Sequence, residues 1–108
     1  MIKCGVDIVY NLKFDGYLGN VNFVSRIFHN SELRDREKLR SIFALKEATM
    51  KALGRKVDWK EIEVRYDNGK PLIELSEDIK PRGFKGIDVS VSHDGDYTIA
   101  FVVIELKH

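Results

Sequence analysis

The stretch LRSIFALKEATMKAL, residues 39–53, decides the fold because it predicts one long helix. At roughly 100° per residue, the apolar side chains fall into one stripe, formed by Leu39, Ile42, Phe43, Met50 and Leu53. Gly54 follows this stripe directly and predicts the end of the helix. The composition favours a start as early as Ser31, whose hydroxyl suits an N-cap, and leaves open a break near Leu39.

The segment before this helix predicts a strand and a short helix. Residues 2–9 place Ile2, Cys4, Val6 and Ile8 at alternate positions, which indicates a half-buried strand. Asp7 then points away from the Val6/Ile8 face. Residues 20–30 have apolar side chains at helical spacing, and Asn20 is a candidate cap.

The segment after the helix predicts two hairpins. Residues 61–66 and 72–75 flank a tight turn at Asp67-Asn68-Gly69. A second pair of strands ends with residues 97–106, and its turn is Asp94-Gly95-Asp96. We therefore expect an α+β fold with a mostly antiparallel sheet packed against the long helix and the short one.

Length and composition narrow the class of protein. A chain of 108 residues can close one core, so we expect a single domain over residues 1–108. The net charge of +1 gives no global attraction to nucleic acid or to an anionic membrane. No segment approaches the ~20 apolar residues of a membrane span, and Asp7 interrupts any signal peptide. The single cysteine, Cys4, excludes an internal disulfide, so we expect a reducing, cytoplasmic location.

The helix carries charge in an unexpected place. Lys46 falls in the middle of the apolar stripe, where an unpaired ammonium is costly. It must extend to the surface, pair with an acid or face an anionic ligand. Glu47 and Lys51 are four residues apart and, taken alone, predict a solvated ion pair on one flank. Asp7, taken alone, is equally compatible with a surface carboxylate or a cap.

The stretch SVSHD, residues 90–94, places a serine and a histidine at the end of a strand. Ser92 and His93 project to opposite faces, and no Gly-x-Ser-x-Gly elbow is present, so we do not expect covalent serine catalysis. His93 shares a face with Val89 and Val91, where a hydrogen-bonded core histidine is as common as a functional one.

Three motifs taken together point to a family. They are Gly5-Val6-Asp7, the central FALKEATMK of residues 43–51 and SVSH at residues 90–93. In this order and spacing the chain resembles the 4′-phosphopantetheinyl transferases of the short, holo-[acyl-carrier-protein] synthase type. The turn Asn68-Gly69-Lys70-Pro71 also resembles a turn of that family.

The resemblance implies an activity and a set of site residues. Such enzymes transfer the 4′-phosphopantetheine group of coenzyme A to a serine of an apo acyl carrier protein and release adenosine 3′,5′-bisphosphate. It implies Asp7 and Glu47 as Mg²⁺ ligands and, with Lys51, as the catalytic residues. The resemblance also implies that Lys51 contacts coenzyme A and its phosphates. The remaining implied contacts with coenzyme A are Pro71, Ser92, His93 and Lys46, the last with structural pairing as an equal alternative. The general base stays open between Glu47 and a metal-bound water.

The resemblance also implies partners. Carrier proteins are acidic, and residues 25–60 hold ten basic and five acidic residues, a local balance of +5. The family's short type forms trimers with active sites between subunits, so we expect a homotrimer. The chain departs from the family at Phe14 and Ile42, where relatives often have basic residues, and its loops are short. These departures put carrier docking in question. The alternative is a non-catalytic basic module that binds an acidic protein or RNA.

Overall fold

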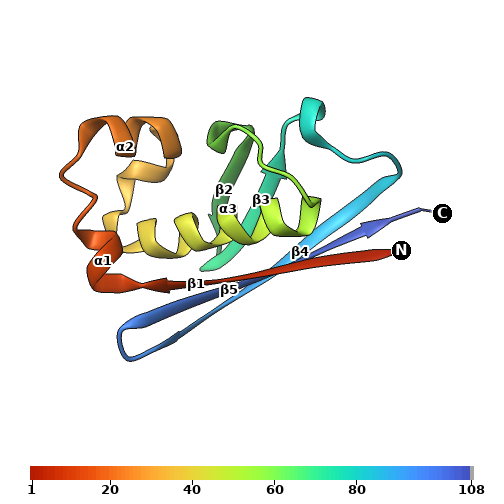
Figure 1. The fold of residues 1–108 in the computed structure, drawn as a ribbon. Helices are drawn as coiled ribbons and strands as arrows, with labels where there is room; N and C mark the ends of the chain where they lie inside the picture. Colours follow the sequence, from red (N-terminus) through yellow and green to blue (C-terminus); the bar gives the residue numbers. More distant parts are fainter. Residues whose placement is uncertain (108) are drawn as a thin grey trace.

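The computed structural model describes residues 1–107. Within these residues, five strands and three α-helices follow one another (Figure 1). They are β1 (Ile2–Tyr10), α1 (Asn11–Asp15), α2 (Val21–Ile27), α3 (Leu39–Leu53), β2 (Ile62–Asp67), β3 (Lys70–Leu75), β4 (Phe84–Asp94) and β5 (Tyr97–Leu106). Short 3-10 turns occupy Glu32–Arg34, Arg36–Lys38, Trp59–Glu61 and Glu77–Ile79.

The strands form two antiparallel sheets. One has the order β1-β5-β4, and the other is the β2–β3 hairpin. The turn of this hairpin is Asn68-Gly69, and both residues have positive φ, 50° and 79°, as a two-residue turn between twisted strands requires. The second predicted hairpin is also confirmed, because β4 and β5 pair up to Asp94 and Tyr97. The predicted α+β class is therefore confirmed.

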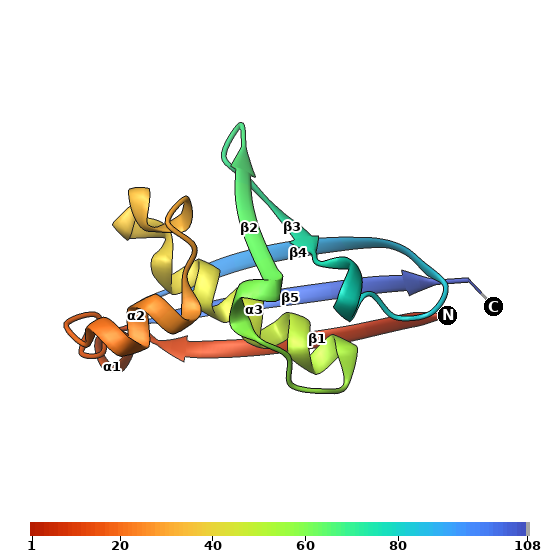
Figure 2. The same ribbon diagram turned by 90° about the horizontal axis from the view of Figure 1, so that it is seen from above.

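Helix α3 lies across one face of the three-stranded sheet, mainly over β1 and β5. The β2–β3 hairpin lies beside the helix, on the side of β4 (Figure 2). The predicted end of the helix is confirmed, since Gly54 has a φ of 77°. The predicted cap at Ser31 is wrong, because α3 begins at Leu39. Asp35 has an extended conformation and accepts a hydrogen bond from the Glu37 amide, so the chain before Leu39 forms two separate 3-10 turns.

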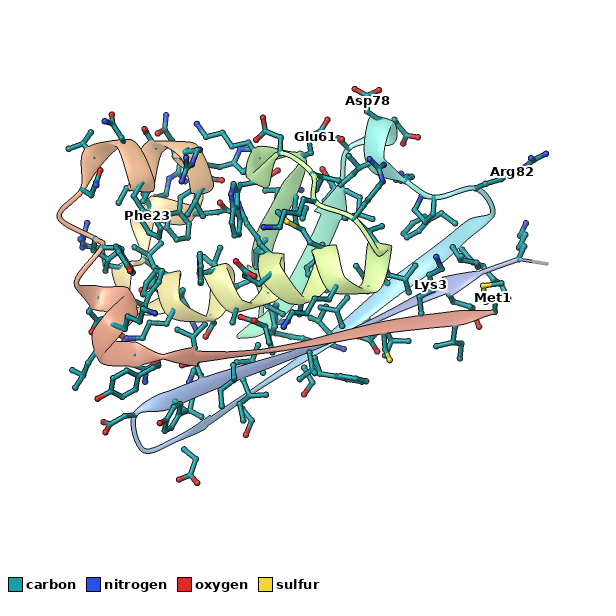
Figure 3. All side chains as sticks on the ribbon, viewed as in Figure 1. Met1, Lys3, Phe23, Glu61, Asp78 and Arg82 are labelled. Atoms are coloured by element: carbon teal, nitrogen blue, oxygen red, sulfur yellow. The ribbon has the colours of Figure 1, made fainter. Side chains whose placement is uncertain are left out.

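The short helix α2 begins as predicted, because the Asn20 side chain accepts a hydrogen bond from the Phe23 amide. Phe23 lies between α2 and α3 and packs on Phe43, with ring centroids 6.0 Å apart (Figure 3). Phe14 of α1 joins the same aromatic cluster. Helices α1 and α2 therefore extend the core beyond one end of the sheet.

Strand β1 buries its less apolar face. Gly5 and Val9 are buried against α3, whereas Val6 and Ile8 are 52% and 60% exposed on the opposite face. Asp7 points away from Val6 and Ile8, as predicted, and so faces the helix side. Glycine at position 5 allows this arrangement, because a Cβ there would lie 2.0 Å from the carbonyl oxygen of Ala48. The backbones of β1 and α3 are thus in direct contact.

No helix within residues 1–107 is both long and apolar enough to cross a membrane.

Candidate functional site

The contact between β1 and α3 brings three predicted site residues together. Asp7 is two residues after Gly5 on the same face of β1, and Glu47 and Lys51 are one turn apart on the facing flank of α3. Lys51 Nζ donates hydrogen bonds to Asp7 Oδ1 at 3.2 Å and to the Val6 carbonyl at 3.0 Å. The expected ion pair between Glu47 and Lys51 is wrong, since Lys51 pairs across to the strand instead.

Asp7 and Glu47 share one partly buried environment. Burial is the main cause that raises the pKa of Asp7, and the bond from Lys51 opposes it. Burial and then the negative charge of Asp7 raise the pKa of Glu47. Two carboxylates that repel each other in this way are suited to a divalent cation. Within residues 1–107, no third His, Cys, Asp or Glu joins them in a metal-binding group.

Both carboxylates line an open cavity of about 480 Å³, here called the carboxylate pocket. Lys13 and Arg26 are the basic residues that line it. Its other walls are mainly aromatic and are formed by Tyr10, Phe14, Tyr17, Phe23, Phe43 and Trp59. Trp59 and Phe43 stack with centroids 5.3 Å apart. The pocket therefore combines an acidic end with an apolar wall.

Lys46 is buried with no exposed surface. Its ammonium donates to Glu32 Oε1 at 2.8 Å and to the Ile27 carbonyl at 2.6 Å. Glu32 also accepts hydrogen bonds from the amides of His29 and Val64, so both oxygens of its buried carboxylate have donors. Burial lowers the pKa of Lys46, and Glu32 opposes this shift. Of the alternatives for Lys46, the structure shows pairing with an acid.

Pro71 and His93 lie in a second pocket of about 530 Å³, here called the β4 pocket. It is mostly polar and is also lined by Lys38, Ser41, Tyr66, Lys70 and Ser90. His93 Nδ1 is 3.1 Å from the Thr98 hydroxyl, which itself donates to Asn11 Oδ1 at 2.8 Å. Nδ1 is therefore the donor to Thr98, and Nε2 is left for other contacts.

The predicted residues thus fall into two groups. The carboxylate pocket and the β4 pocket share no lining residue within residues 1–107. Ser92 lines neither pocket, although it is next to His93 on β4. Asp7, Glu47 and Lys51 are brought together, whereas Pro71 and His93 lie apart from them.

Comparison with known proteins identifies the family. A sequence model of the 4′-phosphopantetheinyl transferase superfamily matches residues 3–102. The chain belongs to this superfamily. The holo-[acyl-carrier-protein] synthase of Pelagibacter ubique is 34% identical, with 99% of this chain and 98% of that protein covered. The synthase of Clostridium tetani is 38% identical, with 97% and 96% covered.

The solved structures agree with this membership. The holo-[acyl-carrier-protein] synthase of Helicobacter pylori, crystallised in complex with coenzyme A, superposes with a TM-score of 0.85. It is 29% identical to this phosphopantetheinyl transferase, and the match covers 97% of this chain and 100% of that one.

The two departures from the family lie in the core of this transferase. Phe14 is 3% exposed, and Ile42 is 2% exposed. Neither side chain can therefore present a docking surface. Sequence reasoning missed Glu32, the partner of Lys46, because its signal is a contact between segments and not a local motif. It also missed Lys38 and Tyr66 as pocket residues.

Proposed function

We propose that the chain, acting as one domain over residues 1–108, transfers 4′-phosphopantetheine from coenzyme A to a serine of an apo acyl carrier protein. The observation that carries this proposal is that Asp7 and Glu47 line one open pocket and that Lys51 donates a hydrogen bond to Asp7. Relatives matched over nearly their whole length are synthases of this kind, which disfavours a non-catalytic basic module.

Asp7 and Glu47 fit a Mg²⁺ ion. Mg²⁺ binds few carboxylates and takes its remaining oxygens from water and substrate phosphates. Two carboxylates with raised pKa, which no third acidic residue joins within residues 1–107, match this donor set. When bound, the ion would neutralise charge on the diphosphate of coenzyme A.

The reaction is a substitution at phosphorus. The carrier serine oxygen forms a bond to the phosphorus that bears pantetheine, and the bond to the bridging oxygen breaks. Adenosine 3′,5′-bisphosphate leaves with the electron pair. Lys51, whose ammonium is held beside Asp7, stabilises charge on the transferring group. Glu47 is the chain's own candidate to accept the serine proton when its carboxylate is not occupied as a metal ligand.

We also propose a homotrimer with active sites between subunits. The face of the sheet opposite α3 exposes large apolar side chains of β1 and β5, including Ile2, Val6, Ile8, Tyr97 and Phe101. Figure 3 shows side chains on this face projecting away from α3 with no ribbon over them. A contiguous apolar surface of this kind is typical of a subunit interface. One coenzyme A would then contact the carboxylate pocket of one subunit and the β4 pocket of another.

Sedimentation tests the assembly. We expect a mass about three times the 12.5 kDa of one chain. Phe101→Glu should reduce the mass to that of a monomer, because it buries a charge in the interface. A wild-type monomer at micromolar concentration contradicts the interfacial site.

The acidic partner and the location follow from the same proposal. Lys13 and Arg26 line the carboxylate pocket, where an acidic carrier could dock next to the reacting groups. Cys4 is exposed and unpaired, which suits the reducing cytoplasm where carriers of fatty-acid synthesis act.

Mass spectrometry tests the function. Apo carriers of the fatty-acid and polyketide classes are incubated with the enzyme, coenzyme A and Mg²⁺, and the added phosphopantetheine mass is measured. We expect transfer by the wild type and its loss in Asp7→Ala and Glu47→Ala. Glu77→Ala, an exposed carboxylate in the Glu77–Ile79 turn, is the matched control. Full transfer by both pocket variants would sink the assignment.

A further inference from the structure

The β4 pocket has the composition of an anion site. Lys38 and Lys70 supply ammonium groups, Ser41 supplies a hydroxyl, and His93 leaves Nε2 free of its bond to Thr98. Glu37 is the one acid that lines the pocket within the described residues. Lys70 Nζ lies 3.9 Å from Asp88 Oδ1, so the aspartate already compensates part of the lysine charge.

Lys38 is the better placed of the two lysines. Its Nζ lies 4.6 Å from the centroid of the Tyr66 ring, and it forms no ion pair within residues 1–107. A cation over an aromatic face is held in place by the ring without losing its charge. Lys38 therefore combines a fixed position with an uncompensated charge.

The fold makes Lys38 the residue that reaches this pocket. It immediately precedes α3, and Ile42 follows one turn later. Ile42 is buried in the core, so position 42 cannot present a group to the pocket. Lys38 lines the pocket from the start of α3, and its ammonium lies over the ring of Tyr66 of β2, which lines the same pocket.

The charges of the proposed substrate leave one phosphate to be placed. Coenzyme A carries a diphosphate and a separate 3′-phosphate monoester. Under the proposed function, Asp7, Glu47 and Lys51 serve the diphosphate. The monoester needs a second cationic site, and the β4 pocket shares no residue with the first.

We propose that Lys38, positioned by the Tyr66 ring, binds the 3′-phosphate monoester of coenzyme A and so determines specificity for it. This inference rests on the proposed function. Lys38 is the binding group, and Tyr66 is a positioning residue that acts through it.

The test compares coenzyme A with 3′-dephospho-coenzyme A. For Lys38→Met we expect the ratio of kcat/KM between these substrates to fall about 10-fold to 100-fold, because a bond between charged groups is lost. The loss should appear in KM. Lys38→Arg should retain most of the preference, since a guanidinium also stacks on a tyrosine. Tyr66→Leu should lose more of it than Tyr66→Phe, which keeps the ring.

Lys80→Met is the matched control, because Lys80 also lies over an aromatic ring, 5.6 Å from the centroid of Phe84, but outside the β4 pocket. An equal fall for both substrates in Lys38→Met, or no fall, overturns the inference. Calorimetry measures nucleotide binding directly and therefore tests the inference even if no carrier is modified. Wild type should bind adenosine 3′,5′-bisphosphate more tightly than adenosine 5′-monophosphate, and Lys38→Met should not. Failure of all transfer by the wild type, with this difference in binding intact, contradicts the proposed function alone.

Discussion

Lys46 and Lys51 lie five positions apart on α3, and each donates a hydrogen bond to a carboxylate from another part of the chain. The Lys46–Glu32 pair has no exposed side-chain surface on either partner. In the Lys51–Asp7 pair, the lysine side chain is 55% exposed and the aspartate 13%. Two ion pairs of one helix therefore differ in their access to a ligand. The closed pair can serve the fold alone, whereas the open pair remains available to a substrate.

The largest expected effect concerns the closed pair. Lys46→Met leaves Glu32 buried with only two backbone amides as donors, so we expect a loss of about 3–5 kcal/mol in the free energy of unfolding. Urea denaturation followed by circular dichroism measures it. Lys51→Met should cost less than about 1 kcal/mol, because its pair is largely open to water. Equal losses in the two variants would remove the distinction.

The open pair should dominate activity instead. For Lys51→Met we expect kcat to fall about 10²-fold to 10³-fold, by loss of charge stabilisation at the transferring phosphate. Steady-state transfer to an apo carrier measures this, with stability checked in parallel. Lys51→Arg should recover part of the rate. A wild-type rate in Lys51→Met would leave the open pair without a role in transfer.

The backbone contact beneath the open pair gives the next prediction. Gly5→Ala places a methyl group 2.0 Å from the Ala48 carbonyl oxygen and 2.7 Å from the Ala52 nitrogen, so β1 and α3 must separate. We expect a loss of about 1–3 kcal/mol in stability, together with a loss of transfer, because Asp7 moves away from Glu47. Gly86→Ala is the control, since a Cβ there meets nothing within 4 Å. A crystal structure of Gly5→Ala in which α3 has not moved away from β1 would contradict this prediction.

The smallest effect is a dependence on pH. Asp7 and Glu47 have raised pKa values in the folded state, so protonation favours folding. Their contribution to the free energy of unfolding is therefore largest at low pH. It declines as the pH rises from the ordinary pKa values of these groups through their raised pKa values in the folded state. At pH 7, Glu47→Gln should be more stable than the wild type by less than about 1 kcal/mol, and the difference should disappear in acid. Thermal melts at several pH values check this.

Mg²⁺ sharpens the same measurement. At pH 7 the ion should raise the melting temperature of the wild type, because it binds the charged carboxylates of the folded state. The rise should be absent in Asp7→Asn. An equal rise in both proteins contradicts a metal site at Asp7.

Local patterns predicted much of the fold. The Asn68-Gly69 turn, the strands that meet at Asp94 and Tyr97 and the end of α3 at Gly54 all follow from residues a few positions apart. Glycine and asparagine adopt positive φ at these points, and this preference acts within the turn itself. The family motifs likewise predicted that Asp7, Glu47 and Lys51 act as one group.

Contacts between distant segments lay outside those patterns. Had one helix run from Ser31 to Leu53, Glu32 and Lys46 would lie about 21 Å apart along it. The extended Asp35 breaks that path and returns Glu32 to the side of α3, 2.8 Å from the Lys46 ammonium. Likewise, alternation alone could not tell which face of β1 packs on α3, because Gly5 acts by close approach and not by hydrophobicity.

The sequence by itself determined the types of element, their turns and the family to which the chain belongs, because these depend on neighbouring residues. Only the tertiary structure decided that the Lys46 ion pair is buried and the Lys51 ion pair is open to solvent, and that β1 exposes its apolar face. It also decided that the implied metal ligand Asp7 and the implied coenzyme A contact His93 lie in separate pockets. The reason is that burial and charge compensation depend on which distant segments pack together, and this is a property of the whole folded chain.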